Sequence, residues 1–254
     1  MLNTIIKMKK GVKLNKPILI VGLPGIGNVG KLVAENLRRE FSATKFAVLY
    51  SPHFPHQVVM RKDGGIHLVN NRFYYIKSKN GSNDIVLLTG DVQAITPEGQ
   101  YEVNSRIIKF FKNVLHGSFV YTIGGYSESE SIINKPKVFA NATSKKIAEE
   151  FSKLGVELGK TKGAIWGSAG LLIAFAKMEK IDGICLMGET GVLDVDPAAA
   201  KAVLLVLANK LGLKVDTSKI DKMIEETAKL LKELEQQNNI ISEPKEFQKP
   251  TYIR

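Results

Sequence analysis

A glycine-rich turn between an apolar run and an amphipathic helix constrains this fold more than any other stretch of the sequence. The run ILIVG at 18–22 follows a proline and ends in glycine, which is typical of a buried strand. The helix that follows has apolar residues at helical spacing: Val29, Leu32, Val33, Leu37 and Phe41. A second apolar run, KFAVLY at 45–50, completes a strand–helix–strand unit. Such a unit favours a parallel sheet with a right-handed crossover.

The same alternation of strand and helix patterns continues to residue 213. Further buried strands are predicted at 84–91, 118–125 and 182–190, and helices at 97–115, 141–155 and 196–213. The stretch 163–180 is predicted to contain a glycine turn and then an apolar helix. Asn141 or Thr143 is the candidate cap of the second of these helices. Two short strands around Asp63-Gly64-Gly65, with a third at 72–78, predict an antiparallel β insert. We therefore expect one α/β domain, at 1–215, with helices on both faces of a mostly parallel sheet.

Composition excludes several classes of protein. No apolar run approaches the ~18–20 residues of a membrane span, and the four histidines have no zinc-motif spacing. The net charge of +11 can indicate nucleic acid or an acidic partner, but no nucleic-acid recognition motif accompanies it. The single cysteine, Cys185, lies in a predicted buried strand, where a structural role is favoured over a nucleophilic one. A cytoplasmic protein without metal, membrane or nucleic-acid partner is expected.

The glycine turn matches two nucleotide-binding patterns incompletely. The segment 25–30 reads G-x-G-x-x-G, but the acid that holds a ribose is missing, because Asp63 is the first acid after the second strand. The segment 25–31 also resembles a P-loop, but Leu32 stands where the magnesium-binding hydroxyl belongs. The turn is therefore predicted to be structural, with its glycines allowing a tight bend and close packing of helix on sheet. No nucleotide cofactor is expected.

Two other groups of polar residues could carry chemistry. Ser168 lies in GSAG, which lacks the G-x-S-x-G pattern of a nucleophile elbow, and the histidines are remote in sequence. Glu189, Asp194 and Asp196 follow a predicted strand, where they could line a ligand cleft or form a polar loop with a helix cap. Because no complete catalytic set is present, we identify no catalytic residue and do not expect an enzyme.

The C-terminal part of the chain has a different pattern. A helix at 216–240 has a narrow apolar seam at Ile220, Ile224, Thr227, Leu231 and Leu234 on a charged surface. The seam suits packing on its own domain or pairing with another subunit. The segment 241–254 has two prolines and mixed charges, which predict a flexible tail. It ends in Tyr252, Ile253 and Arg254, which could anchor a partner or fold back on the domain.

Several motifs occur in the same order as in one known family. These are GLPGIGNVGKLVAENL, GDVQAITPEGQYE, YTIGGY, GAIWGSAGLL and GICLMGETG. The chain resembles the archaeal homologues of eukaryotic proteasome assembly chaperones. The resemblance implies a nucleoside-phosphorylase-like three-layer α/β/α sandwich without catalytic residues, and a homo-oligomer.

The same resemblance implies ATP-independent binding to the α subunits of the 20S proteasome through C-terminal tails, with Tyr252, Ile253 and Arg254 as the contact residues. Ring-binding partners often carry tyrosine second from the end, whereas Tyr252 is third from the end. The alternative function is an enzyme or binding protein for a nucleoside-like small molecule.

Overall fold

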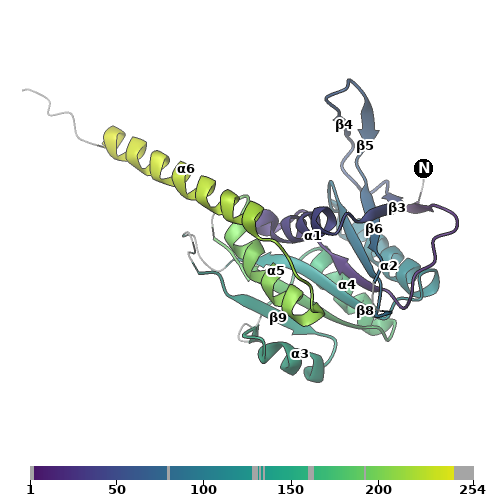
Figure 1. The fold of residues 1–254 in the computed structure, drawn as a ribbon. Helices are drawn as coiled ribbons and strands as arrows, with labels where there is room; N and C mark the ends of the chain where they lie inside the picture. The colour runs from purple at the N-terminus through teal and green to yellow at the C-terminus, as the bar shows by residue number, and fades with distance from the viewer. Residues whose placement is uncertain are drawn as a thin grey trace, which may run out of the picture.

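The computed structural model describes residues 3–78, 81–127, 131, 133, 135–159, 163–191 and 193–242, with the backbone alone for 235–242. Within these residues a nine-stranded sheet runs through the protein (Figure 1). Its strands are β1 (Ile5–Met8), β2 (Ile18–Val21), β3 (Thr44–Tyr50), β6 (Asn71–Ile76), β7 (Ile85–Gly90), β8 (Phe119–Tyr126), β9 (Val138–Ala142), β10 (Glu157–Leu158) and β11 (Asp182–Glu189). The helices are η1 (Ile26–Asn28), α1 (Val29–Glu40), α2 (Pro97–Asn113), α3 (Lys145–Ser152), α4 (Ser168–Met178), α5 (Pro197–Leu211) and α6 (Ser218–Ser242).

The centre of the sheet is parallel and its flanks are mixed. The strand order is β1-β3-β6-β7-β2-β8-β11-β9-β10, and the four central strands β7, β2, β8 and β11 are parallel to one another. Strands β6 and β9 pair antiparallel on either side of them. The predicted hairpin forms a separate ribbon of β4 (Val58–Met60) and β5 (Ile66–Leu68). The α/β fold expected from the sequence, with an antiparallel insert, is confirmed.

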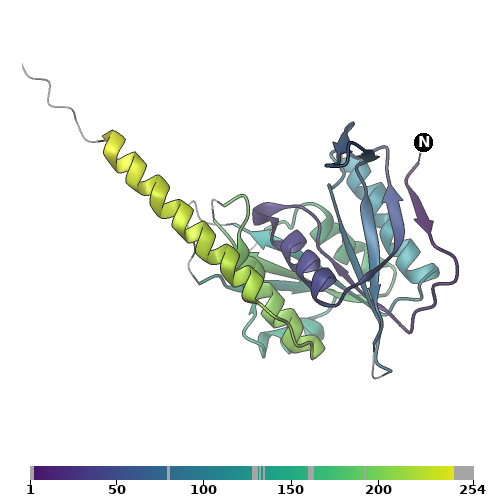
Figure 2. The same cartoon turned by 45° about the horizontal axis from the view of Figure 1, so that its top comes forward.

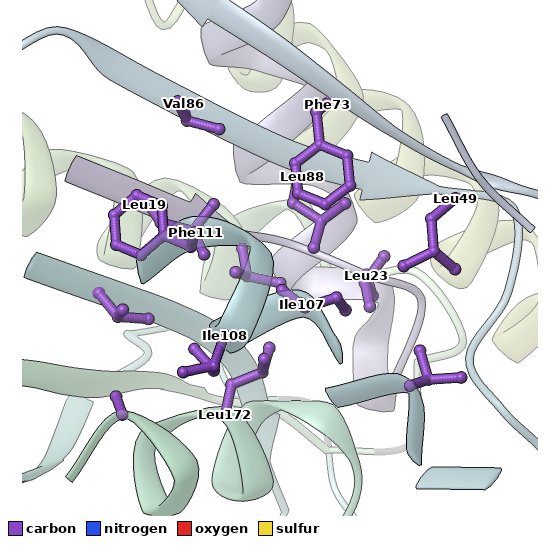
Figure 3. Close-up of a cluster of buried hydrophobic side chains, with 14 of the residues drawn as sticks. Leu19, Leu23, Leu49, Phe73, Val86, Leu88, Ile107, Ile108, Phe111 and Leu172 are labelled. Atoms are coloured by element: carbon purple, nitrogen blue, oxygen red, sulfur yellow. The ribbon is translucent and has the colours of Figure 1, made fainter. Parts of the chain in front are cut away.

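Helices cover both faces of the sheet and bury alternate residues of each strand. On one face Leu19 and Val21 of β2 pack with apolar residues of α2 and α4, including Ile107 and Leu172 (Figure 3). On the other face Ile18 and Ile20 pack with residues of α1, α3 and α5. Successive residues of a strand point to opposite faces of the sheet, and helices cover both faces. All residues of the central strands β2 and β7 are therefore buried, which explains why these strands are continuous apolar runs in the sequence.

Local boundaries differ from the sequence expectation at one helix. The predicted helix at 141–155 begins only at Lys145, and its cap is Ser144, whose hydroxyl accepts from the Ile147 N–H. Asn141 instead lies in β9, which pairs with β11, while Thr143 Oγ1 accepts from the Gly183 N–H. The conformation of residues 138–142 depends on pairing with β11, which is distant in sequence. The local pattern of residues therefore cannot predict it.

Helix α6 projects from the body of the protein (Figures 1 and 2). Its first turns are fixed by burial of Ile220 and by Lys201 of α5, whose Nζ donates to Asp221 Oδ1 at 2.5 Å. Further along, Leu230 and Leu234 are 56% and 47% exposed. With 25 residues the helix is about 37 Å long. Its seam begins on the domain, where Ile220 is buried and Ile224 packs against the core, and reaches the exposed Leu234. None of the helices in the described part of the chain is long and apolar enough to span a bilayer.

Candidate functional site

The glycine turn joins β2 to α1 through the short helix η1. Gly27 and Asn28 have left-handed backbone angles, with φ of 59° and 49°. A Cβ at Gly22 would overlap the carbonyl oxygen of Gly30, and a Cβ at Gly30 would overlap that of Ile123 in β8. The absent side chains therefore let the start of α1 lie directly on the backbone of the sheet. This confirms a packing role for Gly22 and Gly30.

The structure also shows the surroundings of two further residues of the nucleotide-like patterns, Lys31 and Gly25. Lys31 is the third residue of α1 rather than part of a phosphate-binding loop. Gly25 has no close neighbour, because an added Cβ would lie 3.6 Å from Gln93 Nε2. The expectation that Gly25 serves close packing of helix on sheet is wrong, because the structure has room for a side chain at this position.

A glutamine holds the turn against the opposite helix. Gln93 Nε2 donates to the Pro24 carbonyl oxygen at 2.6 Å, and Gln93 Oε1 accepts from the Ser168 N–H at 2.9 Å. Gln100 Nε2 reaches the same Oε1 at 3.3 Å. The loop after β7 thus joins the glycine turn to the first residue of α4. Sequence reasoning missed Gln93, because a single glutamine in a loop has no recognisable spacing.

Ser168 is a structural residue in this arrangement. It is 3% exposed, and its hydroxyl lies 3.3 Å from Gln100 Oε1. A glutamine amide cannot take up a proton as a histidine base does. The described hydrogen-bond partner of the Ser168 hydroxyl is therefore not a general base.

Among the acidic residues at the end of β11 and after it, Asp196 caps a helix, and only the backbone carbonyl of Asp194 has a hydrogen bond among the described contacts, from Asn28 Nδ2. Asp196 is buried; its Oδ1 accepts from the Ala199 N–H at 2.9 Å and its Oδ2 from Thr190 Oγ1 at 2.7 Å. The Asp196 N–H donates to the Gly27 carbonyl oxygen at 2.8 Å. Glu189 turns to the N–H of Lys137 instead. Of the two alternatives for this cluster, the helix cap is the one observed, and it ties α5 to the glycine turn.

A cleft of about 1060 Å³ opens between the glycine turn, the end of β8 and the start of α4. It lies at the carboxyl ends of β2, β8 and β11, the edge where open α/β sheets bind their ligands. Its lining includes Ile26, Gly124, Tyr126, Trp166 and Met187. Among the described residues, no group of three or more His, Cys, Asp or Glu side chains could hold a metal ion.

Cys185 is expected to be unreactive in the folded protein. It is fully buried in β11, and burial raises the pKa of its thiol to about 11, although a hydrogen bond with Thr122 partly opposes the shift. At pH 8 the thiol stays protonated and inaccessible, so Ellman's reagent should detect no thiol in the native protein and one after unfolding. Rapid labelling of the native protein would contradict this assignment.

With this geometry in place, comparison with known proteins identifies the family. The model of the PAC2 family matches residues 19–235, which include both faces of the sheet and most of α6. The chain belongs to the PAC2 family. This confirms the resemblance to archaeal homologues of proteasome assembly chaperones, because the solved PAC2-like structures described next include such homologues.

Three relatives match the PAC2 chain over most of their length. Pyrococcus furiosus PbaB, described as an archaeal proteasome activator, is 40% identical with a TM-score of 0.86, and the match covers 92% of this chain and 100% of that one. An uncharacterized protein of Methanocaldococcus jannaschii is 37% identical over 85% of this chain and 82% of its own. P. furiosus PbaA, an archaeal homolog of proteasome-assembly chaperone, has a TM-score of 0.76 at 24% identity over 94% of both chains, which shows the shared fold.

The candidate site residues that the sequence analysis named in this PAC2 protein lie in two parts of the chain. The glycine turn, Ser168 and the acids after β11 lie around one end of the sheet, as described above. Tyr252, Ile253 and Arg254 lie outside the described residues. Chaperones and activators are not an enzyme class, which agrees with the structural roles of Ser168 and Asp196.

Proposed function

We propose that this protein is an ATP-independent binding protein that engages the α-ring of the 20S proteasome through its C-terminal tails. The observation that carries the proposal is α6, a long helix that leaves the domain and leads directly into residues 243–254. A relative that is 40% identical over nearly the whole chain is described as a proteasome activator. The chain thus combines a folded body with a projecting helix that precedes the proposed binding segment in the sequence.

The projecting helix also supports a homo-oligomer. An isolated helix in water gains little stability from its own hydrogen bonds, and most helical stability in proteins comes from packing of an apolar face. Leu231 and Leu234 continue the seam that Ile220 and Ile224 begin, yet α6 contacts its own domain mainly through α5 near its start. A second copy of α6 offers a matching seam. Pairing would cover the leucines and bring several tails together.

Several tails on one oligomer would bind a ring far more tightly than one tail. Linking binding segments raises the overall affinity by ~10²–10⁴ when all can bind at once. Tyr252 supplies a large aromatic surface together with a hydroxyl, and Ile253 adds apolar area beside it. Such residues dominate the binding energy of small contacts. The tail therefore needs only a few anchors, which its sequence has.

Deletion of 251–254 tests the proposal directly. The truncated protein should keep its melting temperature and oligomeric state but lose affinity for purified archaeal 20S proteasome, measured by biolayer interferometry. Tyr252→Ala should reproduce most of the loss, on the order of 2 kcal/mol or about 30-fold per engaged tail. Tyr252→Phe is the matched control that keeps the ring.

Two outcomes would count against the tail. If the truncation lowers the melting temperature, the tail packs on its own domain, as the alternative in the sequence analysis has it. If binding to the ring survives the deletion unchanged, the contact lies on another surface. The first candidate is then the N-terminal region 1–50, which contains nine Lys/Arg and two acidic residues.

A further inference from the structure

We propose that the cleft at the glycine turn binds an uncharged aromatic heterocycle with a hydrogen-bonding edge. This binding site is separate from the tail and does not depend on the proteasome proposal. The cleft lies where parallel strands β2, β8 and β11 end, and its volume of about 1060 Å³ is at the upper end of small-molecule sites. The chemistry of its walls decides which ligand it suits.

The described lining of the cleft contains no charged side chain. About a quarter of the residues in this chain are charged, yet among the described residues that line the cleft there is no Lys, Arg, Asp, Glu or His. A phosphate or carboxylate that entered would lose hydration without gaining an ion pair, which is costly. The described lining residues therefore favour an uncharged ligand, unlike the nucleotide sites that the glycine pattern resembles.

Two glycines of the lining leave room that the fold does not need. A Cβ at Gly124 would lie 3.5 Å from Ala169 Cβ, and one at Gly25 would lie 3.6 Å from Gln93 Nε2, which are ordinary contact distances. Gly30 and Gly125, by contrast, each face a carbonyl oxygen that a side chain would overlap. Packing thus explains Gly30 and Gly125 but not Gly25 and Gly124. At these two positions the missing side chains widen the cleft.

The remaining lining favours a flat ring with polar atoms at its edge. Trp166, on the loop before α4, is 88% exposed, and Ile26, which also lines the cleft, is 54% exposed. An exposed indole offers a stacking surface, which stabilises bound aromatic rings. The Asn141 amide and the Ser127 hydroxyl, which also line the cleft, supply hydrogen-bond donors and acceptors.

The single tryptophan of the chain gives a direct measurement of binding. Purified full-length protein is titrated with adenine, adenosine, guanosine, uridine and nicotinamide while Trp166 emission is recorded, with AMP as the charged counterpart of adenosine. We expect saturable quenching by at least one uncharged probe with a Kd below about 1 mM, and AMP should bind no more tightly than adenosine.

Variants then locate the bound probe, with affinity measured by calorimetry. Trp166→Ala removes the stacking surface, and Gly124→Val adds a side chain to the cleft lining; each should weaken binding at least tenfold. Because Trp166 is almost fully exposed, its replacement leaves the fold intact even if Gly124→Val does not. Tyr101→Ala, at an aromatic residue that is 61% exposed outside the cleft, is the matched control and should bind normally.

Three results would overturn the proposal. They are the absence of saturable quenching with every probe, unchanged affinity in Trp166→Ala, and tenfold tighter binding of AMP than of adenosine. None of them bears on tail binding to the proteasome, so this site and the proposed function can fail separately.

Discussion

Gly22→Ala is expected to lower the free energy of unfolding by about 3 kcal/mol or more. The new methyl group would overlap the carbonyl oxygen of Gly30 and approach Ala34 Cβ to 2.7 Å. Neither neighbour is the mobile end of a flexible side chain, so α1 must move away from the sheet. That movement would loosen the apolar layer around Val33 and Leu37, both fully or almost fully buried.

The matched control lies three residues away. Gly25→Ala places its methyl group 3.6 Å from the nearest atom and should change stability by no more than ~0.5 kcal/mol. Urea unfolding followed by circular dichroism measures both variants under identical conditions. Equal stability of the two variants would show that the close approach of α1 to the sheet is not what these glycines provide.

Leu231→Glu combined with Leu234→Glu is expected to convert the proposed oligomer to a monomer. Both leucines belong to the seam of α6, and two carboxylates in a dry interface would each lose hydration without a partner. Light scattering at micromolar concentration should give a multiple of 28.0 kDa for the original protein and 28.0 kDa for the double variant. The domain itself should melt at the same temperature, because it contacts the helix mainly near the start of α6.

The control for this prediction changes charge without touching the seam. Lys229→Gln combined with Lys232→Gln removes two positive charges, so its net charge equals that of the leucine variant, and both lysines lie on the face away from the seam. It should remain oligomeric. An original protein that scatters only as a 28.0 kDa species would show that α6 does not pair.

The sequence predicted the layered fold well because its signal is local. Strands such as β2 and β7 are continuous apolar runs, and α5 is preceded by Asp196 and begins with Pro197. Hydrophobic period and cap chemistry are properties of neighbouring residues, so they can be read without the fold. Where conformation depends on a distant partner, as for β9 beside β11, the same signals point to the wrong element.

The site was less predictable for the same reason. Whether a glycine serves packing depends on what faces it, and Gly25 and Gly30 cannot be told apart in the pattern G-x-G-x-x-G. The contacts of Gln93 join three segments that are far apart in sequence. The uncharged lining of the cleft is likewise assembled from residues between 21 and 187, so no window of sequence contains it.

The two outer strands of the large sheet affect how the protein behaves at high concentration. An exposed strand edge can recruit another chain into an endless sheet, and proteins discourage this with short edges and lysines. Here β10 has only two residues, with Lys137 paired to Glu157 at 3.0 Å, while β1 carries Lys7 and is followed by Lys9 and Lys10. Uncontrolled edge-to-edge aggregation is thus opposed at both edges of the sheet. Self-association of this protein should therefore use other surfaces than the strand edges.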